Sequence, residues 1–109
     1  MTIRNLEYAL RPSSIAVIGA SNDGGSVGAK LTENVLSGGF SGPVYLVNPK
    51  HRQIAGHEAF LSIDELPEAP DLAVIATPPD TVPGLIAALG TRGTRAAVVV
   101  TAGLGLELR

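Results

Sequence analysis

Residues 14–28 have the sequence Ser-Ile-Ala-Val-Ile-Gly-Ala-Ser-Asn-Asp-Gly-Gly-Ser-Val-Gly. Residues 15–18 are a continuous apolar run rich in β-branched side chains, which is typical of a parallel strand buried on both faces. The run stops at Gly19, and a segment that can be helical begins near Val27 after a series of small, polar and glycine residues. A strand, a tight glycine-rich turn and a helix N-terminus bring free backbone N–H groups and the positive end of the helix dipole together. This stretch therefore predicts a phosphate-binding turn.

The composition limits the other possibilities. The 109 residues are 45% hydrophobic and 17% charged, which predicts one ordered domain, and two Tyr, two Phe and no Trp make its core aliphatic. Eight Lys and Arg against ten Asp and Glu give a net charge of −2, so no broad basic field is available for nucleic acid. The chain has no cysteine, which excludes disulfides, thiolate metal ligands and a thiol nucleophile within it.

The chain contains no signal of membrane insertion or export. Residues 1–7 lack the apolar core of a signal peptide, and no apolar segment approaches the length that spans a bilayer. The expected location is cytoplasmic, with neither a membrane nor nucleic acid as a partner.

Three further apolar runs resemble the first and predict strands at 44–47, 72–76 and 96–100. Helical spacing of apolar residues predicts helices over 27–36 and 81–91, the second N-capped by Asp80, and a short helix is expected within residues 3–10. Residues 50–65 show no clean period and predict at most a short, poorly formed helix and one further turn from Ser62. The expected fold is α/β, a Rossmann-like open parallel sheet of four strands with flanking helices in one domain, 1–109.

The four predicted strands end in similar small, polar or proline-containing turns. Because the carboxyl ends of parallel strands line the ligand crevice, these turns are expected to face one site. Glycine, proline, asparagine and threonine end strands in many proteins, so a single such turn carries little information, whereas four together favour a binding edge. The turns are Gly19-Ala20-Ser21, Asn48-Pro49-Lys50, Thr77-Pro78-Pro79 and Thr101-Ala102-Gly103.

The details of two turns indicate the kind of ligand. Ser21 stands where a common NAD site has its second glycine, and no carboxylate is present at the end of the second strand to bind the ribose hydroxyls. Lys50 at that strand end instead favours a phosphorylated ribose, as in NADP or coenzyme A, through a charge-assisted contact.

Several motifs of the sequence together resemble the CoA-binding domain of the NDP-forming (ADP-forming) acyl-CoA synthetases, which are related to the succinyl-CoA synthetase α subunit. The motifs, in order, are RPSS at 11–14, VIGAS at 17–21, GSVG at 25–28, VNPK at 47–50, DLAVIATPP at 71–79 and VVVTAG at 98–103. The resemblance implies coenzyme A as the ligand. It also implies that this chain is an N-terminal fragment of a larger protein whose ligase domains, on the same or a partner chain, carry out the catalysis.

The resemblance assigns the cofactor-binding residues. Lys50 is the candidate for the 3′-phosphate of CoA, and the other positions lie in the four turns and at the start of the first crossover helix. The family often has proline within the loop that here contains Asp23, and this carboxylate is expected to face solvent. The full set is Gly19, Ala20, Ser21, Ser26, Val27, Gly28, Asn48, Pro49, Lys50, Thr77, Pro78, Pro79, Thr101, Ala102 and Gly103.

No catalytic or metal-binding residue is expected in this chain. The family's phosphohistidine belongs to a later domain, and His51 and His57 lack the converging ligands of a metal site, so both are interpreted as surface histidines. Asp64 and Glu65 are interpreted as capping or surface charges. Three functions stay open: a CoA-binding domain of an acyl-CoA synthetase, a CoA-binding regulatory module of a GNAT-type protein acetyltransferase, and an NADP-binding reductase domain.

Overall fold

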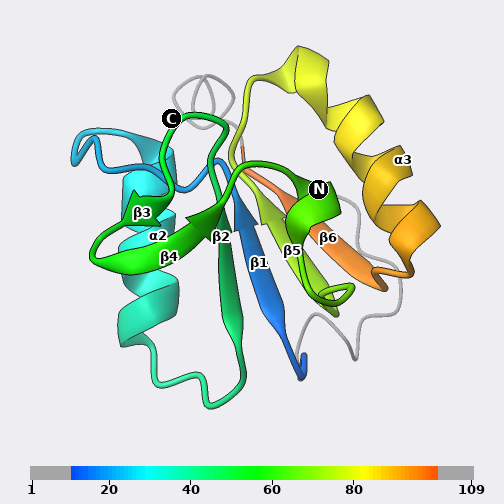
Figure 1. The fold of residues 1–109 in the computed structure, drawn as a ribbon, viewed down its shortest axis with the longest axis horizontal. Helices are drawn as coiled ribbons and strands as arrows, with labels where there is room; N and C mark the ends of the chain where they lie inside the picture. Colours follow the sequence, from blue (N-terminus) through cyan, green and yellow to red (C-terminus); the bar gives the residue numbers. More distant parts are fainter. Residues whose placement is uncertain (1–10, 101–109) are drawn as a thin grey trace, which may run out of the picture.

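The computed structural model describes residues 11–100, so the predicted helix within residues 3–10 and the predicted turn at 101–103 lie outside the described residues. A six-stranded sheet in the order β3-β4-β2-β1-β5-β6 forms the centre of the domain, and all of its pairs are parallel except β3 with β4 (Figure 1). The elements are β1 (Ile15–Ile18), α2 (Val27–Ser37), β2 (Val44–Val47), β3 (Gln53–Ile54), β4 (His57–Phe60), the 3₁₀ turn η1 (Ile63–Glu65), β5 (Leu72–Ile75), the 3₁₀ turn η2 (Pro79–Thr81), α3 (Val82–Arg92) and β6 (Ala96–Val99).

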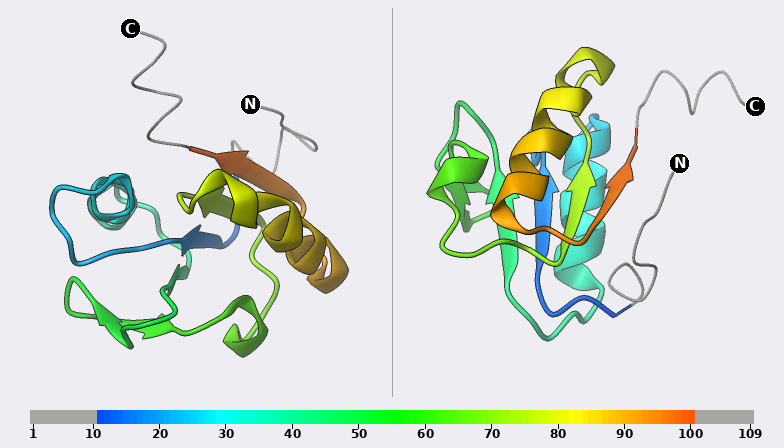
Figure 2. Two further views of the ribbon diagram at one scale, coloured as in Figure 1. Left: turned by 90° about the horizontal axis from the view of Figure 1, so that it is seen from above. Right: turned by 90° about the vertical axis from the view of Figure 1, so that its right-hand side faces the viewer.

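The two helices cover opposite faces of the sheet (Figure 2). Side chains alternate along β1, so Val17 faces α2 whereas Ala16 and Ile18 face the side that α3 covers. Ala16 and Val17 are both 0% exposed. The continuous apolar run therefore is a central strand buried on both faces, as the sequence predicts, and the α/β Rossmann-like fold is confirmed.

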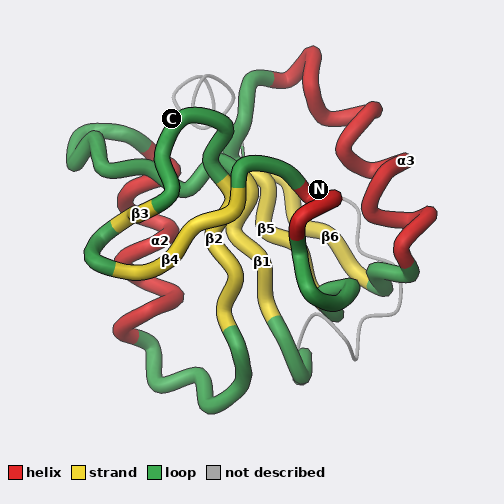
Figure 3. Tube along the Cα trace, in the orientation of Figure 1, coloured by secondary structure: helices red, strands yellow, loops and turns green. Residues whose placement is uncertain are grey.

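The segment 50–65 is the main difference from the sequence-based expectation. Residues 53–60 form the β3–β4 hairpin instead of a poorly formed helix, and β4 adds to the sheet by parallel pairing with β2 (Figure 3). The further turn expected from Ser62 is present as η1. Ala55 (φ +53°) and Gly56 (φ +80°) make its two-residue turn, with both residues in the left-handed region. The prediction of four strands was wrong because each hairpin strand buries a single side chain, Ile54 or Ala59.

The helix predictions are confirmed with one correction. The first helix begins at Val27 and ends at Ser37, one residue beyond the expectation. Asp80 is not the N-cap of α3, because η2 comes first and the helix begins only at Val82. The Thr81 hydroxyl donates to the Pro78 carbonyl at 2.7 Å, which stabilises this extra turn.

The second helix is joined to the 3₁₀ turn after β4 by one side chain. The Arg92 guanidinium donates to the carbonyls of Ile63, Asp64 and Leu66 at 3.1, 3.1 and 2.7 Å. The Ile63 carbonyl also accepts from the Leu66 N–H within the turn. Among residues 11–100, no helix has the length and apolar character needed to cross a membrane.

Candidate functional site

The strand order places a topological switch point between β1 and β5. The chain leaves β1 toward β2 on one side and later returns to β5 on the other, and ligands of open α/β sheets bind outside the carboxyl ends of strands at such a point. The predicted turns 19–21, 48–50 and 77–79 follow β1, β2 and β5, which are adjacent and parallel. Three of the four predicted turns therefore lie at one edge of the sheet, and the fourth lies outside the described residues.

Two glycines bring the first turn and the first helix into close contact. A Cβ atom on Gly28 would lie 2.0 Å from the Gly19 carbonyl oxygen, so the first turn of α2 packs directly on the end of β1. Gly19 has φ +96°, and a Cβ there would lie 2.8 Å from the Ala76 carbonyl oxygen. Only glycine fits at both positions, because backbone carbonyls occupy the places of the missing side chains, so the N-terminus of α2 packs directly against the end of β1 as in a phosphate-binding strand–turn–helix unit.

Side chains within the glycine-rich loop determine its shape. The Ser26 hydroxyl caps α2 by accepting from the Ala29 N–H at 3.1 Å and donates to the Asp23 carbonyl at 2.8 Å. The Ser21 hydroxyl accepts from the Asp23 N–H at 2.9 Å. The N–H groups of Val27 and Gly28 belong to the first helical turn and therefore have no intrahelical acceptor. They are the donors through which the loop can bind an anion.

Asp23 affects the charge of this loop. The residue is exposed, as the sequence analysis expects, and its Oδ1 accepts from the Gly25 N–H at 3.2 Å. A carboxylate beside the start of α2 is favourable for the helix dipole but repels a second anion at the same place.

The turn after β2 is built around the Asn48 side chain. Its Nδ2 donates to the Ala20 carbonyl at 2.8 Å, and its Oδ1 accepts from the N–H groups of Lys50 and His51 at 2.7 and 3.0 Å. Asn48 thus joins the end of β2 to the turn after β1. Pro49 and Lys50 are exposed, so the ammonium group of Lys50 is accessible to a ligand at this edge.

The turn after β5 is closed by two hydroxyl groups. The Oγ1 atoms of Thr77 and Thr81 are 2.6 Å apart, and because Thr81 donates to the Pro78 carbonyl, Thr77 is the donor between them. Pro78 and Pro79 are exposed. This turn offers two proline rings next to Gly19, where a Cβ atom would also lie 3.1 Å from Thr77 Cγ2.

One residue of the edge is absent from the sequence-based set. Asn22 reaches from the glycine-rich loop to the β3–β4 hairpin, where Nδ2 donates to the Gln53 carbonyl and Oδ1 accepts from the Ala55 N–H, both at 3.0 Å. Its position in the loop is visible in the sequence, but its partners lie in a hairpin that the sequence does not predict.

Charged groups near the edge are few. The Arg52 guanidinium lies 3.5 Å from the Glu65 carboxylate, whereas Lys50, His51 and His57 are exposed. Within residues 11–100 there is no group of three or more His, Cys, Asp or Glu side chains placed to hold a metal ion.

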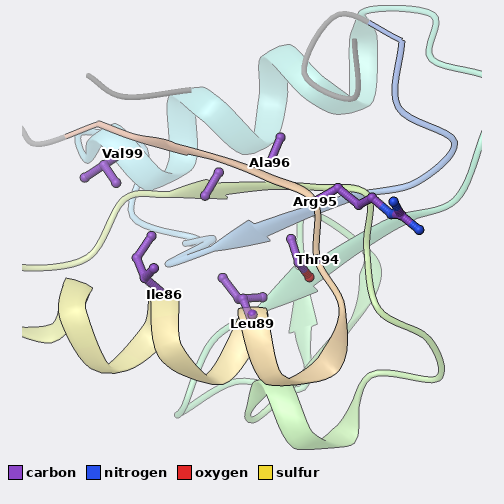
Figure 4. Close-up of a pocket in the computed structure, with 8 residues that line it drawn as sticks. Ile86, Leu89, Thr94, Arg95, Ala96 and Val99 are labelled. Carbon is purple, nitrogen blue, oxygen red and sulfur yellow. The ribbon is translucent and has the colours of Figure 1, made fainter. Parts of the chain in front are cut away.

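Two hollows lie beside the described fold. One, of about 420 Å³, opens between α2 and the hairpin turn and includes Ser21, Asn22 and Ala55. The other, of about 520 Å³, runs along β6 beneath α3, and Figure 4 shows Ile86 and Leu89 extending from the helix toward the strand. Its lining is mostly aliphatic and includes Ile86, which at 41% exposed is an unusually accessible large apolar side chain.

The sheet order, the two helical layers and the glycine-rich turn define a doubly wound, Rossmann-like domain with a glycine-rich turn at its switch point. Comparison with known proteins makes the class specific, because the model of the CoA binding domain family matches residues 13–107. The chain belongs to this family. The expected resemblance to ADP-forming acyl-CoA synthetases is confirmed.

The curated relatives of this chain are much longer than the chain itself. An ADP-forming acetate–CoA ligase of Archaeoglobus fulgidus is 41% identical over 98 residues, which cover 90% of this chain and 14% of the relative. A trans-feruloyl-CoA synthase from an unknown prokaryotic organism is 41% identical over 100 residues, 92% of this chain and 14% of the relative. An acetyl-coenzyme A synthetase of Ca. Korarchaeum cryptofilum, solved with phosphate and ADP, has a TM-score of 0.83 to this chain at 40% identity. The match covers 90% of this chain and 21% of the synthetase chain.

Proposed function

We propose that this chain binds coenzyme A across the carboxyl ends of β2, β1 and β5, as the CoA-binding part of an ADP-forming acyl-CoA synthetase. The observation that carries the proposal is the contact between Gly28 and Gly19, which holds the N-terminus of α2 and its free amides directly at the carboxyl end of β1. In such a protein the domain presents the thiol of CoA to an acyl group that other domains activate. No residue of this chain takes a catalytic role.

The turns around this contact bind different parts of CoA. The amides of Val27 and Gly28 face the diphosphate, and the turn at 19–21 lies against the same part of the ligand. The exposed Lys50 binds the 3′-phosphate, while the turn containing Thr77, Pro78 and Pro79 borders the pantetheine arm. The described residues fit this ligand because they combine free amides at the N-terminus of α2 for the phosphates, one accessible cation and two exposed prolines. The proposed turn at 101–103 would complete the crevice.

Calorimetric titration of the chain with CoA, dephospho-CoA and NADP tests the proposal. CoA should bind more tightly than dephospho-CoA, and Lys50→Ala should remove this difference by weakening CoA binding about tenfold, because a charge-assisted contact to an exposed phosphate is lost. Lys30→Ala is the matched control, since Lys30 is the other lysine of the chain and lies exposed on α2. Saturable binding of NADP without binding of CoA would contradict the proposal and favour a reductase domain.

A further inference from the structure

The side chain of Asn22 imitates a neighbouring strand. A residue of a parallel strand donates with its N–H and accepts with its C=O, and its two partner groups lie two residues apart in the neighbouring strand. The Asn22 carboxamide does the same with the carbonyl of Gln53 and the N–H of Ala55. These two bonds join segments that are 31 and 33 residues apart in the sequence. Asn22 therefore connects the glycine-rich loop to the β3–β4 hairpin at its turn.

The hairpin needs such a support. β3 and β4 pair over only two residues each, Gln53 with Glu58 and Ile54 with His57. Ala55 in the turn has φ +53° and is the sole non-glycine residue with a positive φ among residues 11–100. A Cβ atom makes this conformation unfavourable, so a hydrogen bond to the Ala55 N–H helps to keep the turn in place.

The glycine-rich loop is thereby fixed on two sides. Asn48 donates to the Ala20 carbonyl from the β2 side, and Asn22 fixes the loop two residues further along against the hairpin. The cap at Ser26 holds the end of the loop, so side-chain hydrogen bonds fix the loop at Ala20, Asn22 and Ser26. A loop that already has its bound conformation loses less conformational entropy when a ligand binds.

We propose that Asn22 is a positioning residue, which clamps the glycine-rich loop to the β3–β4 hairpin and so holds the loop amides ready for the diphosphate of CoA. This inference rests on the proposed function. Asn22 acts through the hairpin backbone. Its removal therefore weakens the binding of every ligand that uses the loop amides, whether or not the ligand carries a 3′-phosphate.

The test compares the unaltered chain with Asn22→Ala and Asn22→Leu, the second of which keeps the branched shape of asparagine without its polar atoms. Both variants should bind CoA and dephospho-CoA about tenfold more weakly, by the same factor for the two ligands, because two hydrogen bonds are lost. The thermal midpoint should fall, because the hairpin loses both hydrogen bonds, but both variants should stay folded at the temperature of the titration. Asn34→Ala removes an exposed asparagine from α2 and should bind like the unaltered chain.

Amide hydrogen exchange without ligand separates positioning from direct contact. If Asn22 is a clamp, the amides of Ala55 and Gly25 should exchange faster in both variants, and a residue that only touched CoA would leave them unchanged. Tight CoA binding by the unaltered chain and by both variants would overturn the clamp while sparing the proposed function. Absence of CoA binding by the unaltered, folded chain would overturn the proposed function and with it the role of Asn22 in binding.

Discussion

Single residues decide what the glycine-rich loop can bind. Gly19 and Gly28 leave no room for a side chain at their contact, and Ser26 uses its hydroxyl to cap α2, so the loop presents backbone to the ligand. Asp23 is the exception, because it brings a negative charge to a site that should attract phosphates. Its carboxylate accepts from the Gly25 N–H and thereby competes with an incoming anion for a loop donor.

Asp23→Asn should therefore strengthen CoA binding. The amide oxygen of asparagine can still accept from the Gly25 N–H, so the loop keeps its path while the charge is removed. We expect a gain of about twofold to threefold at low ionic strength that declines as salt is added, since the repulsion is between exposed charges.

Titrations of CoA at two salt concentrations measure this gain. Asp64→Asn, the same change at an exposed residue of η1, serves as the control and should leave the affinity unaltered. Weaker binding by Asp23→Asn would show that the carboxylate assists the ligand.

At the scale of elements, β2 is joined to the segment after η1 by a phenol–carboxylate pair. The Tyr45 hydroxyl donates to Glu68 Oε2. The Tyr45 ring packs edge to face on the ring of Phe60 in β4, with 6.0 Å between the ring centroids. This hydrogen bond, followed by burial and the negative charge of Glu68, raises the pKa of Tyr45 from 10.0 to about 12. The bond thus ties β2, which is already paired with β4 in the sheet, to the segment after η1.

The raised pKa predicts a pH window for this bond. Because the folded-state pKa of Tyr45 lies above the unfolded value, its contribution to stability is complete below pH 10 and is lost as the pH rises toward 12. In a Tyr8→Phe background, which leaves Tyr45 as the remaining tyrosine, the ultraviolet absorbance of the phenolate should titrate near 12. Adding Glu68→Ala should move that midpoint toward 10.0. Equal midpoints with and without Glu68 would contradict this account.

The elements also show what the sequence can and cannot predict. β1, β2, β5 and β6 were predictable because each is a short apolar run that a turn ends, and three of those turns lie at the edge proposed to bind CoA. The hairpin was missed because its strands alternate exposed residues with one buried residue each, and its Ala55–Gly56 turn lacks the asparagine or aspartate that typically precedes the glycine. Asn22 was missed for the same reason, since its partners lie in that hairpin.

At the scale of the molecule, the chain spans 14% of the curated relatives that are 41% identical to it. The described domain has two candidate ligand surfaces, the carboxyl edge of the sheet and the aliphatic hollow between α3 and β6. They differ in chemistry, because the edge offers backbone donors and an exposed lysine whereas the hollow offers mostly aliphatic side chains. A ligand as rich in phosphate as CoA should select the edge.

Mapping CoA on the chain by amide chemical shifts during a titration tests this central claim most directly. The account predicts saturable changes at the amides of residues 19–28 and of Asn48, Lys50 and Thr77, whose neighbouring prolines carry no N–H, with the amides of α3 and β6 little affected. Changes confined to the hollow around Ile86 and Ala96, or none at all in the folded chain, would contradict it.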